Sequence, residues 1–581
     1  MSSDGTAQQY VSHSGSENVA WQGIQDLWQG NLLCDVTLIA GERSFEAHRC
    51  YLASCSPYFL SMFTGAFRES TEKEVKIQGM SAKGLEDVIS YMYTGKVELH
   101  HDNLKDILDV ACHLQVIDIQ KFCEDYMKKY LSIDNCLQFL NLTELYSLEE
   151  TGTVVFNYMR DNFAEVAENA DFNSITLELL CALLSSDSLY IESELTVFRS
   201  AIKWLQYAPE RLLHTTRVLR LVRFGLMSSK EMKEVYEPGG LMMQETCEEL
   251  LKAALDYHMN EFEQPLLATQ LSSPRNSVDS LIMYGGLPLA SDKLLAAQIG
   301  PTDLMNYSHF GELKEMRSEA QVVVLNNFLF VVGGKSAPPS NVVNSAFRYN
   351  PRDGKWVRLS SMATARSNFA LVALSGCLYA IGGYNDEDLP LSCVEKYQIK
   401  DNKWSRVANL NHGILGHAGC ECGGQLFISG GSSDGRQLQS YSPASDAWQT
   451  RTPMTYGRTR HNMVSYGNSL YVLGGAVVIA NSQDEALQTE MYNLDTCQWT
   501  VLSPALLRHW GAGCAQHGSS VYILGGLSVP TNQIMKKIQH YNIDANKWTV
   551  LNSVLPVHVF QLAAAYLKLP LLVFQNDVNS H

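Results

Sequence analysis

Tyr471-Val472-Leu473-Gly474-Gly475 is one of five segments in which a short apolar run ends in two glycines. The same pattern occurs at Phe330–Gly334, Tyr379–Gly383, Phe427–Gly431 and Tyr522–Gly526. A tryptophan follows each pair, in steps of 48, 44, 51 and 49 residues: Trp356, Trp404, Trp448, Trp499 and Trp548. One four-stranded sheet cannot cover both of its faces, so a repeat of this length predicts the blades of a β-propeller.

Within each repeat the glycines let the chain turn where no Cβ fits. A tyrosine precedes each tryptophan: Tyr349, Tyr397, Tyr441, Tyr492 and Tyr541. We expect both rings in the core and no chemistry from either. Gly-Gly, Tyr and Trp in this order resemble the kelch repeat, since the period is mostly longer than that of a WD40 blade and the chain has no Trp-Asp dipeptide.

The two ends of the repeat region are predicted to share one blade. Leu281–Gly286 opens a repeat that lacks its first strand, and the β-compatible run Phe560–Tyr566 follows the last tryptophan. Pairing the two runs would leave no exposed sheet edge and would fasten the ring. The sequence therefore predicts a six-bladed propeller closed by the C-terminal strand.

A small α/β domain is predicted near the N-terminus. Leu33–Ile39 and Ser44–Ala47 form a predicted hairpin, Ser56-Pro57 starts a helix, and a further helix runs from its cap Ser81 to Gly95. Residues 1–17 are polar and predicted to be disordered.

Four motifs of this domain resemble a BTB domain over about Asn18 to Tyr130: Cys34-Asp35-Val36-Thr37-Leu38, Phe45-Glu46-Ala47-His48-Arg49, Leu52-Ala53 with Ser56-Pro57-Tyr58-Phe59, and Tyr91-Met92-Tyr93-Thr94-Gly95. The resemblance implies that Asp35 and His48 are a structural polar pair. It also implies a homodimer formed through the first helix. That helix presents four apolar residues at helical spacing: Trp21, Ile24, Leu27 and Trp28. From the residues alone, these side chains pack either on their own domain or on a dimer partner.

BTB domains that recruit the cullin-3 scaffold carry a hydrophobic-x-Glu triplet after the helix that begins Ser-Pro-Tyr-Phe. This chain has Phe67-Arg68-Glu69 at that place. The resemblance implies cullin-3 binding by this triplet together with Tyr58 and Met62. An exposed Phe in a loop favours the same interpretation.

From Leu104 to about Met259 the apolar period is helical. Leu189-Tyr190-Ile191-Glu192-Ser193-Glu194 and Arg220-Leu221-Val222-Arg223-Phe224 resemble the BACK domain that follows BTB in the kelch-like family. Glu263–Ser280, with two prolines and several serines, is predicted to be a linker. The predicted domains are a BTB domain at 18–130, a BACK domain at 131–262, the linker at 263–280 and the propeller at 281–581.

Composition excludes several classes of function. The net charge of −17 argues against nucleic acid as the main partner. The first twenty residues show no secretory signal, and no run predicts a membrane span, so we expect a cytoplasmic protein with the nucleus as a second location. The 14 cysteines are expected to be reduced, and Cys420-Glu421-Cys422 lacks the second pair that a zinc site needs.

Four arginines stand before the first strands of the blades, 16, 16, 14 and 17 residues ahead of the glycine pair: Arg317, Arg366, Arg460 and Arg508. The third repeat has Gly416-His417 there. We expect these five side chains to surround one opening and to bind an acidic segment of a protein substrate, because guanidinium groups bind carboxylates with forked donors. The alternative is that each arginine pairs with an acidic neighbour inside the propeller.

No cofactor motif and no acid/base constellation appears, and the scattered His412, His417, His461 and His509 form no local metal-binding motif. The chain is identified as a member of the kelch-like family. This implies a non-catalytic substrate adaptor of a cullin-3 RING ubiquitin ligase, dimeric through BTB, with the propeller as receptor. The alternative from another class is a dimeric actin-binding or scaffold protein without a ligase role.

Overall fold

The computed structural model describes residues 9–12, 19–236, 245–269, 272–287, 294–299, 305–313, 315, 317–336, 340–432, 435–479 and 482–570. The chain divides into two compact units. The first comprises Met1–Leu184, Leu189–Ile191 and Arg199–Leu212. The second comprises Ser185–Ser188, Glu192–Phe198 and Leu213–His581. None of the helices in the described ranges is long and apolar enough to cross a membrane.

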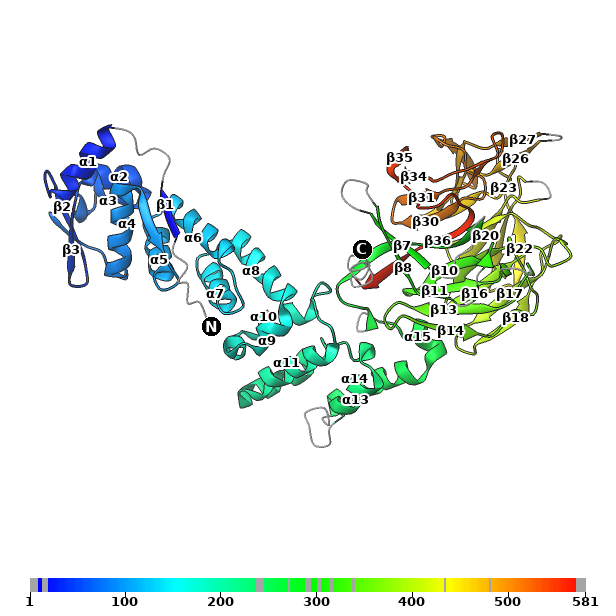
Figure 1. The fold of residues 1–581 in the computed structure, drawn as a ribbon, viewed down its shortest axis with the longest axis horizontal. Helices are drawn as coiled ribbons and strands as arrows, with labels where there is room; N and C mark the ends of the chain where they lie inside the picture. Colours follow the sequence, from blue (N-terminus) through cyan, green and yellow to red (C-terminus); the bar gives the residue numbers. More distant parts are fainter. Residues whose placement is uncertain are drawn as a thin grey trace. The chain divides into compact units, whose positions relative to one another are not determined.

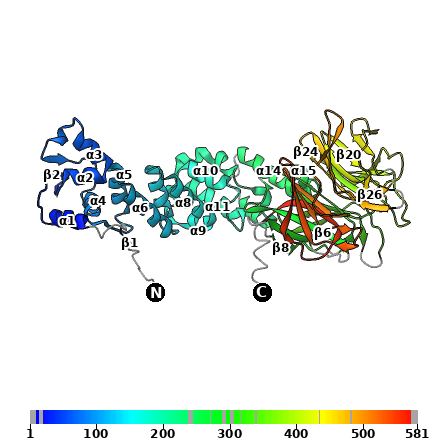
Figure 2. The ribbon, with the colours of Figure 1, turned by 90° about the horizontal axis from the view of Figure 1, so that it is seen from above.

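The N-terminal part of the first unit is a small α/β domain (Figures 1 and 2). Its sheet pairs β2 with β3 antiparallel and with β4 parallel. Its elements are β1 (Gln9–Ser12), α1 (Val19–Gln29), β2 (Val36–Ala40), β3 (Arg43–Ala47), α2 (Arg49–Cys55), α3 (Pro57–Thr64), η1 (Arg68–Ser70), β4 (Glu74–Lys76), α4 (Ala82–Thr94), β5 (Lys96–Leu99), α5 (Leu104–His113) and α6 (Ile117–Lys129).

The predicted helix signals are confirmed. The Ser56 side chain accepts from the Phe59 amide at the start of α3, and Ser81 accepts from the Gly84 amide at the start of α4. Gly95 ends α4 in the left-handed conformation, with φ 65°. The prediction of disorder throughout residues 1–17 is wrong for Gln9–Ser12, because this segment forms β1 and pairs antiparallel with β5.

Helices continue into the second unit, as the 3.6-residue period predicts. Their bounds are α7 (Cys136–Leu145), α8 (Glu149–Asp161), α9 (Phe163–Glu168), α10 (Leu177–Ser185), α11 (Glu194–Gln206), α12 (Thr215–Leu219), α13 (Ser229–Val235), α14 (Glu245–Met259) and α15 (Gln264–Leu267).

Six four-stranded sheets of the second unit are the blades of a propeller. The first, in sheet order, is β36 (Phe560–Pro570), β6 (Ser277–Leu287), β7 (Leu294–Ile299) and β8 (Met305–Phe310). The second is β10 (Gln321–Leu325), β11 (Phe328–Val332), β13 (Ala346–Asn350) and β14 (Lys355–Leu359). The third is β15 (Ala370–Leu374), β16 (Cys377–Ile381), β17 (Val394–Gln398) and β18 (Lys403–Val407).

The remaining blades have the same antiparallel order. The fourth is β19 (Ala418–Cys422), β20 (Gln425–Ser429), β21 (Leu438–Ser442) and β22 (Ala447–Thr450). The fifth is β24 (Asn462–Tyr466), β25 (Ser469–Leu473), β28 (Thr489–Asn493) and β29 (Gln498–Leu502). The sixth is β30 (Gly513–His517), β31 (Ser520–Leu524), β34 (Lys537–Asn542) and β35 (Lys547–Val554).

The blades pack on one another in cyclic order. The innermost strands make contact in the sequence β36, β10, β15, β19, β24, β30 and again β36. Each hydrophobic cluster of the propeller draws its residues from two neighbouring sheets, as where Tyr284 of β6 meets Leu329 and Val331 of β11. The C-terminal strand β36 pairs antiparallel with β6 from Phe560 to Pro570, as the sequence predicts.

The repeated aromatic residues join adjacent blades. Each tyrosine ring lies within about 5 Å of the tryptophan ring of its own blade, for example at 5.1 Å for Tyr397 and Trp404. The indole N–H of Trp404 donates to the Ser360 carbonyl of the preceding blade at 2.8 Å, and Trp448 does the same to Ala408. The prediction that these rings are core is confirmed.

The segment predicted as a linker is packed onto the second blade. The guanidinium of Arg348 on β13 donates to the Glu261 carbonyl and to Oε1 of Gln264. Asn326 donates to the Pro265 carbonyl at 2.7 Å. A flexible linker over the whole of 263–280 is therefore wrong, because α15 is held by propeller side chains that its own sequence does not reveal.

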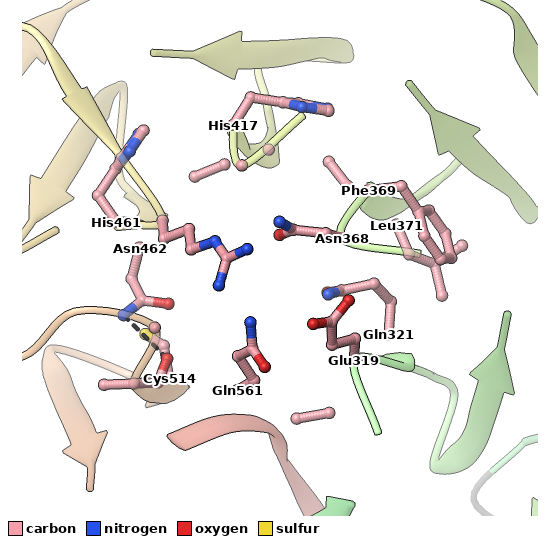
Figure 3. A pocket seen from close by; sticks show the side chains of 18 of the residues that line it. Glu319, Gln321, Asn368, Phe369, Leu371, His417, His461, Asn462, Cys514 and Gln561 are labelled. Carbon is pink, nitrogen blue, oxygen red and sulfur yellow. Dashed lines mark hydrogen bonds between the residues drawn. The ribbon is translucent and has the colours of Figure 1, made fainter. Parts of the chain in front are cut away.

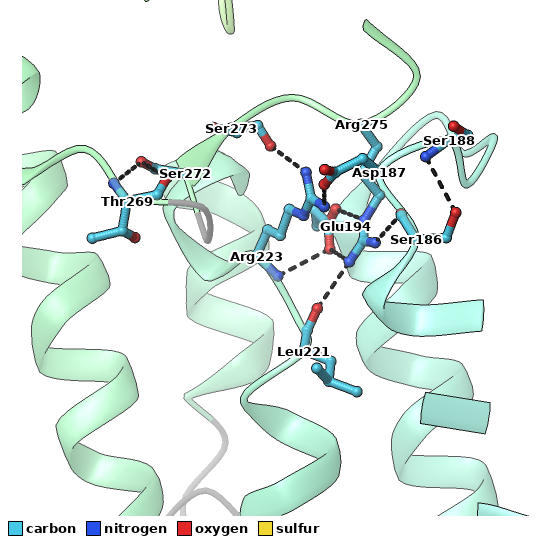
Figure 4. A network of polar contacts seen from close by, with 10 residues as sticks. All are labelled: Ser186, Asp187, Ser188, Glu194, Leu221, Arg223, Thr269, Ser272, Ser273 and Arg275. Atoms are coloured by element: carbon cyan, nitrogen blue, oxygen red, sulfur yellow. Dashed lines mark hydrogen bonds and ion pairs between the residues drawn. The ribbon is translucent and has the colours of Figure 1, made fainter. Parts of the chain in front are cut away.

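A second anchor is a buried ion pair between Arg275, just before β6, and Glu194 on α11 (Figure 4). Nε of Arg275 lies 2.5 Å from Oε1 of Glu194, and both side chains are buried. Glu194 also accepts from the Arg223 amide, and Arg275 donates to the Leu221 carbonyl. The helices of this unit and the first blade therefore share one polar network.

We predict that Arg275→Met lowers the free energy of unfolding by about 3–5 kcal/mol, because it leaves the Glu194 carboxylate buried without its partner. The loss is measured as a shift of the urea midpoint followed by tryptophan fluorescence. The double variant Arg275→Met/Glu194→Leu should recover most of it. A single variant as stable as the parent chain would contradict the structural role of the pair.

Candidate functional site

Three arginines, hereafter the clamp arginines, lie 16 residues before the first glycine of their blade: Arg317, Arg366 and Arg458. All three are fully buried. Arg366 donates to the carbonyls of Gly382 and Cys393 and pairs with Glu395 of its own blade at 2.7 Å. The prediction that Arg317 and Arg366 bind substrate at an opening is wrong, and the alternative of internal pairing holds for both.

The other two clamp arginines make equivalent contacts. Arg317 donates to the Gly333 carbonyl and pairs with Glu315, while Arg458 donates to the Gly474 carbonyl and pairs with Glu490 at 2.6 Å. Burial lowers the pKa of Arg458, and Glu490 opposes that shift. These guanidinium groups fix the glycine turn of their own blade.

A different set of residues, two positions further on, surrounds the central cavity. We call it the channel ring; it has one residue per blade, in the order Gln561, Glu319, Asn368, Gly416, Arg460 and Gly511. All six have a left-handed backbone, with φ between 50° and 68°. Backbone hydrogen bonds link neighbours around the ring, since the Arg460 amide donates to Gly416 and the Gly511 amide donates to Arg460.

The cavity inside the channel ring has a volume of about 230 Å³. Figure 3 shows the side chains of Glu319, Asn368 and Gln561 directed into it from separate elements. With its amide oxygen turned toward the guanidinium, Asn368 accepts from Nε and Nη2 of Arg460 at 3.2 Å. The ring therefore presents one acid, one base and two carboxamides to whatever enters the channel.

The two charged ring residues are held by neighbours from their own and adjacent blades. The Arg460 guanidinium stacks over the Trp510 ring at 4.5 Å. Oε2 of Glu319 accepts from the hydroxyls of Ser367 at 2.6 Å and Tyr384 at 2.5 Å. Burial lowers the pKa of Arg460, while Glu319 acts in the opposite direction.

Of the five predicted substrate-binding residues, only Arg460 lies in the channel ring. Arg508 is exposed and stands three positions before Gly511, and His417 is buried next to ring residue Gly416. The sequence analysis missed Glu319, Asn368 and Gln561. A constant count of 14 residues back from each glycine pair would have found the first two, because it separates the ring position from the clamp position.

Three buried histidines lie beside the glycine pairs of the preceding blades: His417, His461 and His509. A Cβ at Gly382 would lie 2.9 Å from Cε1 of His417, so this ring occupies the space that the glycine leaves. Burial, with Arg366 adding to it, lowers the pKa of His417 to about 4. Burial lowers the pKa of His509 to about 4 and that of His461 well below its usual value.

The predicted cullin-binding residues lie on α3 and the turn after it. Phe67 is 59% exposed, and Leu60 on α3 is 49% exposed. Arg68 is exposed, whereas Tyr58, Met62 and Glu69 are half-buried. Burial raises the pKa of Tyr58, with a smaller contribution from nearby Glu69.

The turn that carries Phe67 is held by its own domain. Arg49 donates to the carbonyls of Glu69 at 2.7 Å and Ser70 at 3.0 Å, and Ser70 Oγ donates to the Phe67 carbonyl. The backbone that presents the exposed ring is thus fixed before any partner binds.

The four predicted dimerisation residues are half-buried on α1. The Trp21 indole donates to the Tyr93 carbonyl at 2.7 Å, and the Trp28 ring stacks on Tyr93 at 4.5 Å. Trp28 also donates to the Glu46 carbonyl. Both tryptophans pack on their own domain, and the half-buried Ile24 and Leu27 lie on the same helix.

Comparison with known families agrees with this division of the chain. Residues 24–131 match the BTB/POZ domain, and residues 136–237 match the domain described as BTB And C-terminal Kelch (BACK). Residues 281–526 match the Attractin/LZTR1 beta-propeller, and residues 511–554 match the Kelch motif. Fold and sites together define a protein with BTB, BACK and kelch domains.

Curated relatives align over nearly the whole chain. Kelch-like protein 26 of Danio rerio is 35% identical over 91% of this chain and 89% of its own length. Kelch-like protein 36 of Bos taurus is 32% identical, with 92% and 88% covered, and Kelch-like protein 15 of Mus musculus is 29% identical, with 87% and 88% covered. The chain belongs to the kelch-like family of BTB-BACK-kelch proteins.

We predict that the propeller loses stability as the pH falls from about 6.5 toward 4. In this window the unfolded chain protonates its histidines while folded His417 and His509 stay neutral, which costs about 2 kcal/mol per histidine at pH 5. Thermal unfolding at pH 7 and pH 5 measures the effect.

The variant His417→Phe, which copies Phe369 at the same position of the third blade, should reduce this acid sensitivity. Replacing the exposed His412 with Gln is the matched control and should leave it unchanged. Equal acid sensitivity in both variants would contradict the assignment.

Proposed function

We propose that this chain is a substrate adaptor of a cullin-3 RING ubiquitin ligase. Three observations support the proposal: the order of BTB, BACK and kelch domains, the exposed Phe67 on a fixed turn, and the polar ring of the propeller. In this function the BTB domain binds cullin-3, the propeller binds the protein to be modified, and the catalytic steps belong to other subunits.

The exposed Phe67 is the observation that carries the cullin assignment. An aromatic side chain 59% exposed in a turn held by Arg49 resembles an interface anchor, because its burial by a partner gains apolar contact at little cost in ordering. Leu60 and Met62 on α3 extend the apolar surface, and Arg68 and Glu69 form its polar border. We infer that cullin-3 covers this surface.

The proposal includes a homodimer formed by the BTB domain, with Ile24 and Leu27 on the helix that takes part. It places the protein in the cytoplasm, with the nucleus as a second location. It keeps the predicted boundaries of the BTB domain at 18–130 and of the BACK domain at 131–262. The propeller acts on proteins rather than on nucleic acid or membranes.

We also infer that β36 closes the propeller and holds the channel together. Its pairing with β6 and its contacts with β10 and β30 support this inference. The same strand carries Gln561, so the ring is complete only when the C-terminal strand is in place.

We predict that Phe67→Ala weakens cullin-3 binding about tenfold or more, because it removes the apolar anchor. Pull-down of purified cullin-3 by the full chain measures this, and size-exclusion chromatography should show an unchanged oligomer. Leu389→Ala, which removes a 54% exposed side chain from the propeller, is the matched control and should bind normally.

Undiminished cullin-3 binding by the Phe67 variant would reject this surface. A parent chain that binds no cullin-3 would favour the actin-binding or scaffold function instead.

We predict that Ala564→Pro lowers the melting temperature of the propeller by several degrees, because proline cannot donate to the β36–β6 ladder where Ala564 pairs with Met283. Ala564→Ser keeps the backbone donor and is the control. A proline variant that melts with the control would argue against closure by β36.

A further inference from the structure

We propose that the channel ring binds the side-chain carboxamide of an asparagine or glutamine in the substrate. This inference rests on the proposed function of the propeller as a receptor and names the chemical group that it recognises. It replaces the expectation of an acidic segment, which depended on four arginines around one opening.

The ring combines one negative and one positive group on opposite sides. Glu319 is the second residue of the ring order and Arg460 is the fifth, so the two lie across the cavity from each other. Among the ion pairs of the described residues, none joins Glu319 to Arg460. A ligand between them meets an acceptor on one side and donors on the other.

Two acceptors stand side by side in the ring. Glu319 receives the Ser367 and Tyr384 hydroxyls on Oε2, which leaves Oε1 for another donor. Oε1 of the neighbouring Gln561 is buried and accepts no hydrogen bond from any described residue. A buried acceptor without a donor is costly, so a ligand with two N–H groups would satisfy both positions.

The donor side is fixed in advance. Trp510 lies under the Arg460 guanidinium, and Asn368 accepts from Nε and Nη2. Arg460 has further N–H groups with which it can bind a carbonyl oxygen. The ring neighbours of Arg460 are Gly416 and Gly511, so no side chain from either position competes with its ligand.

A primary carboxamide carries this set of groups: two N–H donors and one carbonyl acceptor. It is also neutral, so its entry leaves no unpaired charge in the channel. A carboxylate bound to Arg460 would face Glu319, and an ammonium group bound to Glu319 would face Arg460. Both charged ligands are therefore disfavoured by a group that the ring already contains.

The size of the cavity agrees with this ligand. A volume of about 230 Å³ is below the range of about 300–1,000 Å³ that is typical of drug-sized ligands and suits a single side chain. The remaining affinity for the substrate then comes from the loops around the channel, while the ring selects one residue of it.

The test uses a random peptide library displayed on phage and selected against the full-length chain. The parent chain should enrich peptides with Asn or Gln at one fixed position. Glu319→Gln removes the repulsion of a carboxylate and should shift that position to Asp or Glu, whereas Arg460→Gln should shift it to Lys or Arg, each by about tenfold in enrichment.

Asp401→Asn and Lys403→Gln remove exposed charges at the outer edge of the third blade and should leave the selected position unchanged. Thermal unfolding establishes that each variant is folded. If Arg460→Gln does not fold, Arg460→Lys takes its place, because it keeps the charge but loses the forked donors.

Enrichment of acidic peptides by the parent chain would overturn the inference. So would an enriched motif that neither ring variant changes, and in that case the receptor function would still stand. A chain that enriches no peptide at all would instead count against the receptor function itself.

Discussion

The hydrogen bonds of the clamp arginines are the interaction on which the propeller depends. A buried guanidinium is stable only when carbonyls and a carboxylate surround it. Arg366 meets this need through Gly382, Cys393 and Glu395 and thereby fixes the turn of its own blade. Its carbonyl accepts from the Gly334 amide of the preceding blade at 3.0 Å, so the same residue joins two blades. Two positions later the chain reaches the channel ring, whose left-handed backbone follows from this anchoring. The fourth blade has no arginine at the clamp position, and there Gln437 donates to the Gly430 carbonyl instead.

The parts of the fold that depend on neighbours in the sequence could be predicted. The cap at Ser56, the end of α4 at Gly95 and the Tyr-Trp pairs follow from local spacing. The attachment of α15 to the second blade could not be predicted, because it depends on Arg348 and Asn326, which come some 60 to 90 residues later. Gln9–Ser12 forms a strand for a similar reason, since its partner β5 is distant in the sequence.

The candidate site was only partly predictable because two arginine positions look alike in sequence. Arg458 and Arg460 are two residues apart, yet the first is buried against Glu490 and the second lies in the channel ring. Charge alone does not separate them; their distance from the glycine turn does. Glu319 carries the opposite charge at the ring position of another blade, so a search for arginines passes over it. For the BTB domain the family resemblance located Phe67, and the structure adds its exposure and the fixed turn beneath it.

The account assigns two binding surfaces to one chain, and its central claim is that their combination brings a substrate to the ligase. Ubiquitin transfer by a purified cullin-3 RING complex measures this claim directly. The substrate is a carrier protein fused to a peptide that the propeller has selected, and the reaction is run with and without the chain. The account predicts transfer to the carrier only when the chain is present and the peptide is intact. Transfer at the same rate without the chain, or no transfer although both partners are bound, would contradict it.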